Sequence, residues 1–272
     1  MRGASRGSVS AAKERLSAAL AGKSAAEAIE VGDQLLAVLG LLDRESALRR
    51  VLSDPSRERE ARIGLADALL AGKIAETTLE LVNGLVASRW SEPSDLTDAI
   101  EQIAVLAIAE AADNEGRLDE LEDELFRFAR IVAGNPDLRA ALSNQFVPAE
   151  GRASLVRALV ARKVGQPALR LITQAAAHPR GRSLDGALES YANLVAELRE
   201  RLVAEVHVAV PLTHDQRGQL AAALATAYGH DVHLNVVLDP GLIGGITVRI
   251  GDELIDGSVA SRLAELRRNL AA

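Results

Sequence analysis

The side chains that could bind a metal or a phosphate gather in the last third of the chain. His230 and His233 lie three residues apart, a spacing found in some metal sites, and His207 could supply a third ligand. However, His230 falls in a predicted turn, and His233 points away from the apolar face of its strand. The alternative is that these are polar groups on a strand surface, and no metal site is predicted.

The run DPGLIGGITVRIG, which begins at Asp239, is rich in glycine, and glycine loops cradle phosphates at helix N-termini. Here no GK[ST] follows, and the run joins two predicted strands rather than a strand and a helix. The alternative is structural, because Gly241, Gly244 and Gly245 permit a tight turn. We therefore predict no nucleotide and no other cofactor.

Patterns for catalysis are equally sparse. The sequence holds no cysteine, no serine in GxSxG and no carboxylate pair placed by a motif, so no catalytic residue is predicted. The eight acidic residues between positions 110 and 124 form either a solvated helix face or a surface for a basic partner. With 31 basic and 38 acidic residues and a net charge of −7, nucleic acid is not expected as a partner.

Several features bear on where the protein works. The lack of cysteine is consistent with a reducing compartment. The amino terminus, MRGASRGSVS, carries two arginines and no apolar stretch, so a secretory signal is not expected. The most apolar stretch, 103–112, contains Glu110 and is shorter than the ~18–20 residues of a membrane span. Membrane association is expected only through partner subunits.

A long helical region must position most of the remaining side chains. Apolar residues recur with a period of 3.6 through most of the first 200 residues, and clusters of turn-forming residues interrupt them. Helices are predicted near 10–21, 25–42, 45–53, 57–71, 75–89, 95–113, 115–133, 137–143, 148–164, 166–177 and 184–203.

The helical region repeats with a shift of 90 residues. Between 48–82 and 138–172, 13 of 35 positions are identical, where chance in so alanine- and leucine-rich a chain gives about 4. The alternative is that any two amphipathic helices share Leu and Ala. The matches at Arg49, Arg62 and Lys73 favour duplication, because core packing does not dictate surface charges.

From about residue 203 the pattern changes to alternation, which predicts strands joined by one helix. That helix begins at a capping box formed by Thr213 and Gln216, a predicted hairpin turns at Gly251-Asp252 and returns through Leu254, and Ser258 caps a closing helix. The last ~70 residues thus predict a small α+β domain. The residues expected to face inward are Val206, Val208, Val210, Leu220, Leu224, Val232, Leu234, Val236, Leu238, Ile246, Val248 and Ile250.

The closing run LNVVLDPGLIGGITVRIGDELIDGSVASRLAELRRNL, from Leu234, resembles the carboxyl-terminal signature of the delta subunit (OSCP) family of F-type ATP synthases. In that family a strand ending in Asp leads to a GG-type strand ending in RIGD, then IDGSV and a helix. The signature residues are Asp239, Gly244, Gly245, Arg249, Gly251, Asp252, Asp256, Gly257, Ser258 and Arg262.

The resemblance also implies a helical front end, because the family begins with a six-helix bundle. A usual delta subunit has one bundle, whereas this chain is similar to enlarged actinobacterial forms with a duplicated bundle. The fold class expected is mostly α with a small α+β carboxyl-terminal domain. The domains expected are bundle copy one at 1–93, copy two at 94–202 sharing helix 95–113, and a stalk-binding domain at 203–272.

By resemblance, the protein is a non-catalytic peripheral-stalk subunit that links the catalytic α/β head to the membrane-anchored b subunit, on the cytoplasmic face of the cell membrane. An amino-terminal helix of an α subunit would bind between the first and fifth helices of a bundle. The positions that match this groove are Leu16, Ala19, Leu20, Leu79, Val82 and Leu85 in copy one and Leu106, Ala109, Leu169 and Ile172 in copy two.

The carboxyl-terminal domain would bind the b subunit through the closing helix, whose apolar residues are Val259, Leu263, Leu266 and Leu270. Deleting 203–272 is expected to abolish b binding while head binding survives. The alternative from another class is a stand-alone helical adaptor that binds client helices. An enzyme is a more distant alternative, and a metal or cofactor bound at His207, His230 and His233 would reveal it.

Overall fold

The computed structural model describes residues 3–144, 146–201, 203–228, 232–239, 241–242, 244–250 and 253–256. The chain divides into two compact units, 1–195 and 196–272. The first is helical and the second combines a sheet with a helix, which confirms the predicted fold class. The finer division at 1–93, 94–202 and 203–272 stays a prediction.

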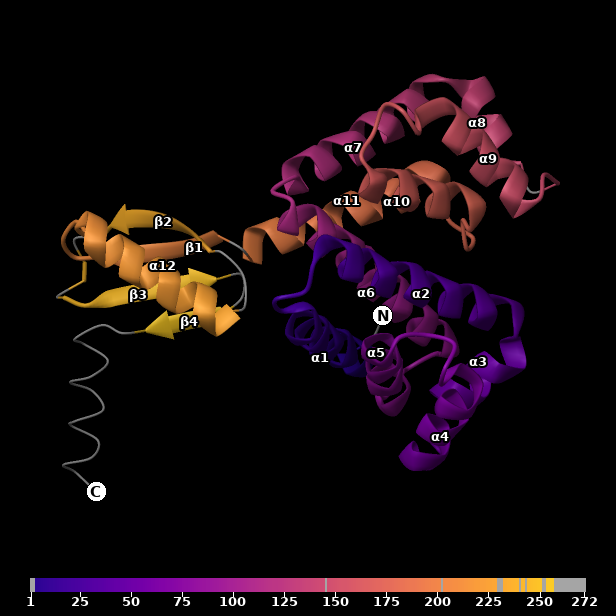
Figure 1. The fold of residues 1–272 in the computed structure, drawn as a ribbon, viewed down its shortest axis with the longest axis horizontal. Coiled ribbons are helices and arrows are strands. Elements are labelled where there is room, and N and C mark those ends of the chain that lie inside the picture. The colour runs from indigo at the N-terminus through magenta and orange to yellow at the C-terminus, as the bar shows by residue number, and fades with distance from the viewer. Residues whose placement is uncertain are drawn as a thin grey trace. The chain divides into compact units, whose positions relative to one another are not determined.

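The first unit is built from helices α1 to α10 and most of α11 (Figure 1). Each helix predicted from the 3.6-residue period in this region is present. Only α1 differs markedly, because it begins at Gly3 rather than near residue 10. Its polar first turns are held by tertiary hydrogen bonds that periodicity does not report: Ser5 Oγ donates to Asp95 (2.6 Å) and Ser8 Oγ donates to the Arg89 carbonyl (2.8 Å). The helices are α1 Gly3–Leu20, α2 Ala25–Arg44, α3 Ser46–Ser53, α4 Arg59–Leu70, α5 Glu76–Ala87, α6 Pro93–Asn114, α7 Leu118–Gly134, α8 Pro136–Ser143, α9 Ala149–Val160, α10 Gln166–Ala177 and α11 Leu184–Arg201.

The helix bounds themselves repeat with the 90-residue shift. Helices α3, α4 and α5 recur as α8, α9 and α10, with every bound 90 positions later, and α1 begins at Gly3 where α6 begins at Pro93. These recurring bounds support the predicted duplication. We call α1 to α6 copy one and α6 to α11 copy two, since α6 closes the first and opens the second.

Helix α6 is the centre of the helical unit. It packs against α1, α2, α3 and α5 of copy one and against α7 and α10 of copy two, so that it runs between the two groups of helices in Figure 1. Leu96, Ile100, Ile103 and Ile108 are fully buried. This central position explains the long apolar stretch in the sequence. Among the described residues, no helix is long and apolar enough to cross a membrane.

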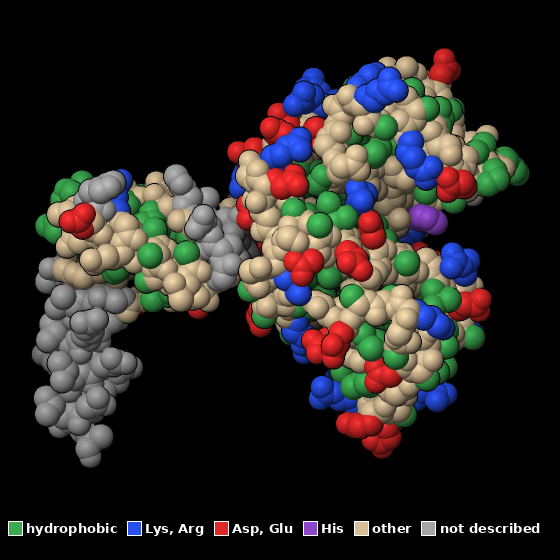
Figure 2. Space-filling model, viewed as in Figure 1, with side chains coloured by type: hydrophobic (Ala, Val, Ile, Leu, Met, Phe, Trp, Pro, Cys, Tyr) green, Lys and Arg blue, Asp and Glu red, His purple; other side chains and the backbone are tan. Residues whose placement is uncertain are grey.

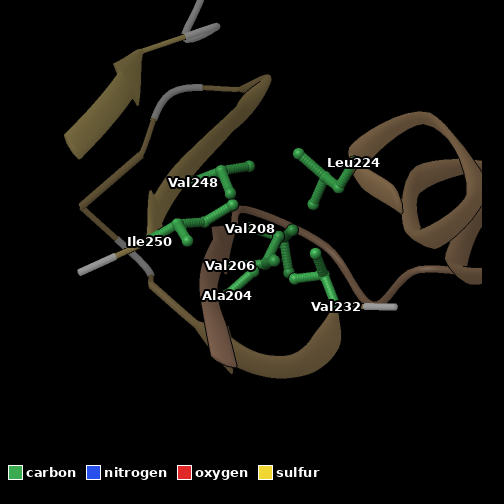
Figure 3. Packing of buried hydrophobic residues seen from close by; sticks show 7 residues of the cluster. All are labelled: Ala204, Val206, Val208, Leu224, Val232, Val248 and Ile250. Carbon is green, nitrogen blue, oxygen red and sulfur yellow. The ribbon is translucent and has the colours of Figure 1, made fainter. Parts of the chain in front are cut away.

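The second unit contains a four-stranded sheet in the order β2-β1-β3-β4. Strand β1 (Val203–Val208) is parallel to β2 (His233–Leu238) and antiparallel to β3 (Ile246–Ile250), and β3 is antiparallel to β4 (Glu253–Asp256). Helix α12 (His214–Tyr228) connects β1 to β2, as parallel neighbours require. Leu224 of α12 points toward Val208 and Val248 of the sheet (Figure 3).

The capping box at the start of α12 is confirmed, because Thr213 N–H donates to Gln216 Oε1 (3.0 Å) and Gln216 N–H donates to Thr213 Oγ1 (3.3 Å). Two expected inward positions are wrong. Val210 lies beyond the end of β1 and is 69% exposed, and Leu238 ends the edge strand β2 and is 56% exposed. The predicted turn at Gly251-Asp252 and the closing helix from Ser258 lie outside the described residues.

Candidate docking surfaces

A buried arginine occupies the same place in each copy. Arg62 donates to the Val86 carbonyl (2.6 Å) at the end of α5, and Arg152 donates to the Ala176 carbonyl (2.8 Å) at the end of α10. Both satisfy helix C-terminal carbonyls that have no partner within the helix. The interpretation of Arg62 as a matched surface charge is therefore wrong, since Arg62 is 4% exposed and Arg152 is 8% exposed.

The groove positions predicted for an incoming helix divide into two groups. Ala19, Leu79 and Leu169 are half-buried, so each keeps some surface for a partner. The other positions lie in the core of the helical unit, where they hold the helices together: Leu16, Leu20, Val82, Leu85, Leu106, Ala109 and Ile172. Their role in binding a partner stays a prediction.

Between α1 and α5 the two helices pack closely, as the predicted groove requires. Arg15 of α1 lies over Gly84 of α5 and donates to its carbonyl (3.2 Å). A Cβ at position 84 would approach the Arg15 side chain to 3.1 Å, so the absence of a side chain lets this arginine cover α5. Trp90 follows α5 and donates from Nε1 to the Leu85 carbonyl (2.9 Å), which fixes the end of the helix.

The counterpart of that surface in copy two lies between α6 and α10, and α2 packs along α6 there. Asp33 of α2 pairs with Arg170 of α10 (3.1 Å). Leu36 of α2 and Leu169 of α10 line one cavity of about 430 Å³. Helix α2 of copy one therefore reaches both helices of the corresponding groove in copy two.

A buried ionic cluster joins the two copies. Glu101 of α6, 3% exposed, accepts hydrogen bonds from Arg180 (2.7 Å), from Arg182 and from the Tyr191 hydroxyl (2.5 Å). Arg180 also forms ion pairs with Asp43 and Asp98, each at 3.0 Å. This cluster was not predicted from the sequence. The signal that could have indicated it is Glu101, a carboxylate flanked by the apolar residues Ile100 and Ile103.

Burial and charge in this cluster shift several ionisation equilibria. Burial raises the pKa of Asp98, although the nearby Arg180 acts in the opposite direction. Burial on its own lowers the pKa of Arg180, but Glu101, Asp43 and Asp98 outweigh it, and the pKa is raised. Burial and the Glu101 carboxylate raise the pKa of Tyr191 well above its ordinary value. The cluster therefore holds Tyr191 protonated and Arg180 charged.

The family-signature residues of the second unit shape its sheet. Asp239 follows β2, its N–H donates to the Val208 carbonyl (2.9 Å), and its carboxylate accepts from the Gly241 N–H (2.8 Å). Gly245 adopts a φ of 87°, a left-handed conformation that favours glycine just before β3. The glycine-rich run therefore joins strand to strand, as predicted.

The structure describes only some of the other signature residues. Gly244 has a φ of 155° at the same bend, Arg249 faces Leu254 across β3 and β4, and Asp256 faces Thr247. The remaining predicted residues lie outside the described part of the chain: Gly251, Asp252, Gly257, Ser258, Val259, Arg262, Leu263, Leu266 and Leu270.

His207 and His233, two of the histidines considered as metal ligands, lie on neighbouring strands but do not face each other, because His207 pairs with Val237 and His233 pairs with Val203. His207 Nε2 lies 3.1 Å from Glu205, and His207 Nδ1 lies 4.0 Å from Asp239. His230 is outside the described residues. Within the described part of the chain, no group of three His, Cys, Asp or Glu side chains is arranged to hold a metal ion.

Comparisons with known proteins place these features in a family. The model for the ATP synthase delta (OSCP) subunit matches residues 104–270, which is most of copy two and the second unit. The ATP synthase subunit delta of Streptomyces avermitilis is 47% identical over 270 residues, covering 99% of this chain and 98% of that protein. The ATP synthase subunit delta of Acidothermus cellulolyticus is 46% identical over 276 residues, covering both chains fully.

One solved structure is also similar. A chain of the mitochondrial ATP synthase hexamer of Toxoplasma gondii is 20% identical, with a TM-score of 0.31, and the match covers 62% of this chain and 95% of that chain.

Proposed function

The chain belongs to the ATP synthase delta (OSCP) subunit family, and we propose that it is a non-catalytic peripheral-stalk subunit of a proton-translocating F-type ATP synthase. In this role it links the catalytic α/β head to the membrane-anchored b subunit, on the cytoplasmic face of the cell membrane, and resists rotation of the head. The observation that carries the proposal is similarity along nearly the whole chain to proteins named ATP synthase subunit delta.

Two attachments on one chain suit this mechanical role. The helical unit binds an amino-terminal helix of an α subunit, and the second unit binds the carboxyl-terminal region of b through Val259, Leu263, Leu266 and Leu270. Each contact acts at the high local concentration that the other creates, so two moderate interfaces together resist torque. The division into two compact units supports the separation of these tasks.

Copy one is the better candidate for the head contact, although the family model matches copy two. The groove between α6 and α10 in copy two is approached by α2, and α6 is buried along most of its length. The groove between α1 and α5 keeps half-buried Ala19 and Leu79 at its surface. An incoming helix would therefore have to displace the exposed Arg15 side chain in copy one, but a packed helix in copy two.

Matched substitutions test the head contact. Leu79 and Leu169 occupy the same position in the two copies and are both half-buried. We expect Leu79→Glu to weaken binding of the full-length chain to the purified α/β head at least 10-fold, and Leu169→Glu to change it less than 2-fold. Thermal unfolding of both variants controls for lost stability. Stronger weakening by Leu169→Glu would assign the contact to copy two instead.

The role as a whole has a separate test. Purified ATP synthase from the organism that makes this chain is expected to contain it, and removing the chain from the complex should uncouple ATP hydrolysis from proton transport. Intact coupling without the chain would reject the proposed function, whatever the outcome for Leu79.

A further inference from the structure

The two copies meet through unlike faces. Copy one presents α2, and copy two presents α6, α9 and α10, with Asp33 paired to Arg170 (3.1 Å) and Leu36 sharing a cavity with Ala153 and Leu169. Because two different faces form this contact, each copy keeps one face that the other copy does not cover. In copy two the counterpart of α2 is α7, and α7 shares a groove with α11.

The α7/α11 face is hollowed into a groove of about 480 Å³. Phe126, the counterpart of Leu36, is 58% exposed in it, and the Arg130 guanidinium lies 5.8 Å from the centre of its ring. The groove residues divide into an apolar floor and a rim with more acidic than basic groups. The floor is Phe126, Ala129, Ala133, Leu188 and Ala192, and the rim includes Glu122, Asp123, Asp185, Glu189 and Arg130.

Phe126 is a large aromatic side chain exposed in this groove, and exposed apolar patches can mark interaction sites. Elsewhere the surface carries acidic and basic side chains side by side, as Figure 2 shows for one face. Phe126 is the counterpart of a residue that the structure shows half-buried against another helix pair. The internal repeat therefore indicates what such a face receives: a helix with apolar residues along its contact stripe and an arginine at the position of Arg170.

A second copy of this chain does not fit that description. The face it would offer is α4 and α5 of copy one, where Glu80 stands at the position of Arg170 and Trp90 at the position of Arg180. Glu80 would then oppose Asp123, the counterpart of Asp33, and two like charges repel. The ion pairs that join the copies within the chain therefore do not recur between chains.

We propose that the α7/α11 groove binds a basic amphipathic helix of another subunit of the complex. Leucine or alanine side chains of that helix cover Phe126, Ala129 and Ala192. A lysine or arginine pairs with Glu189, or with Asp123, which also pairs with Arg127 (3.2 Å). The contact is additional to the α1/α5 groove and to the b-binding unit. It rests on the proposed function only in placing the partner within the ATP synthase.

The test places a photo-reactive benzoylphenylalanine at position 126 of the full-length chain in the assembled ATP synthase. The matched control is position 131, because Ile131 is on the same helix, is 57% exposed and does not line the groove. We expect position 126, and not 131, to cross-link to a helical segment of net positive charge in one other subunit, identified by mass spectrometry.

Substitution gives a second measurement. We expect Phe126→Glu to reduce the yield of that cross-linked subunit at least 5-fold in a salt-washed complex, and Ile131→Glu to change it less than 2-fold. A complex that contains the chain but gives no cross-link from 126, equal cross-links from both positions, or a cross-link to an acidic segment or to this chain's own residues overturns the proposal. Absence of the chain from the complex would instead reject the proposed function.

Discussion

Copy one and copy two share a framework and differ in their surfaces. The bounds of three helices and the buried arginines Arg62 and Arg152 recur after 90 residues. By contrast, Arg180 and Arg170, which join the copies, correspond to Trp90 and Glu80. The comparison indicates that both copies keep the arginine that closes each bundle, while the arginines that join the bundles are present in copy two only.

The largest expected effect comes from a residue that only copy two has. Arg180→Ala should lower the free energy of unfolding of the helical unit by about 3 kcal/mol, because it leaves the buried Glu101 carboxylate with fewer cationic partners. Urea denaturation followed by circular dichroism at 222 nm measures the change. A loss below 1 kcal/mol would mean that the junction contributes little to the stability of the unit.

The next largest effect is expected at the buried arginines that occupy matching positions in the two copies. Arg62→Ala and Arg152→Ala should each cost about 2–3 kcal/mol, because each leaves buried helix-terminal carbonyls without a donor. The same denaturation experiment applies, with the exposed Arg59→Ala as the control expected to change stability by less than about 0.5 kcal/mol. Clearly unequal losses at the two positions would show that the copies no longer use this arginine alike.

The framework of the two copies was predictable from the sequence because local and tertiary preferences agree there. Leu48, Leu52, Leu65 and Leu69 recur 90 residues later at helical spacing, and the corresponding helices are present. The start of α1 was not predictable, because Ser5 joins the helix through a hydrogen bond to a residue 90 positions away. Such contacts leave no periodic signal.

The docking surfaces were harder to predict, because an apolar residue at helical spacing signals burial whether the partner is inside or outside the chain. Leu16 and Val82 were proposed as groove residues and lie in the core, while Phe126, for which no role was predicted, is exposed. Charged residues were equally hard to place. Charged side chains usually lie on the surface, but Arg62 and Glu101 are buried. Only packing distinguishes these cases.

The two tyrosines allow a comparison between the helical unit and the second unit. Burial and the Glu101 carboxylate raise the pKa of Tyr191 well above its ordinary value, and burial together with Glu253 raises the pKa of Tyr228 to about 12. Above about pH 10 the unfolded chain loses a Tyr191 proton that the folded chain keeps. Stability is therefore complete below pH 10 and falls as pH rises, by at most about 1.4 kcal/mol per pH unit for this group.

Absorbance at 295 nm measures this titration, with Tyr191→Phe and Tyr228→Phe assigning the steps. We expect no tyrosinate near pH 10, one step near pH 12 that Tyr228→Phe removes, and a Tyr191 signal only when the helical unit unfolds. A Tyr191 step near pH 10 in the folded chain would contradict its burial beside Glu101.

The smallest effect is expected for the ion pair between Asp33 and Arg170, which can be compared with the matching positions Asp123 and Glu80. A double-mutant cycle of Asp33→Asn with Arg170→Gln should give a coupling of about 0.5 kcal/mol, because the pair is partly exposed and screened by water. The cycle of Asp123→Asn with Glu80→Gln should give no coupling beyond error, since both residues are acidic and cannot form an ion pair with each other. Coupling that fades in high salt for the first cycle alone would show that charge, and not shape, sets which way the copies stack. Equal coupling in both cycles would remove the argument against self-association through the α7/α11 groove.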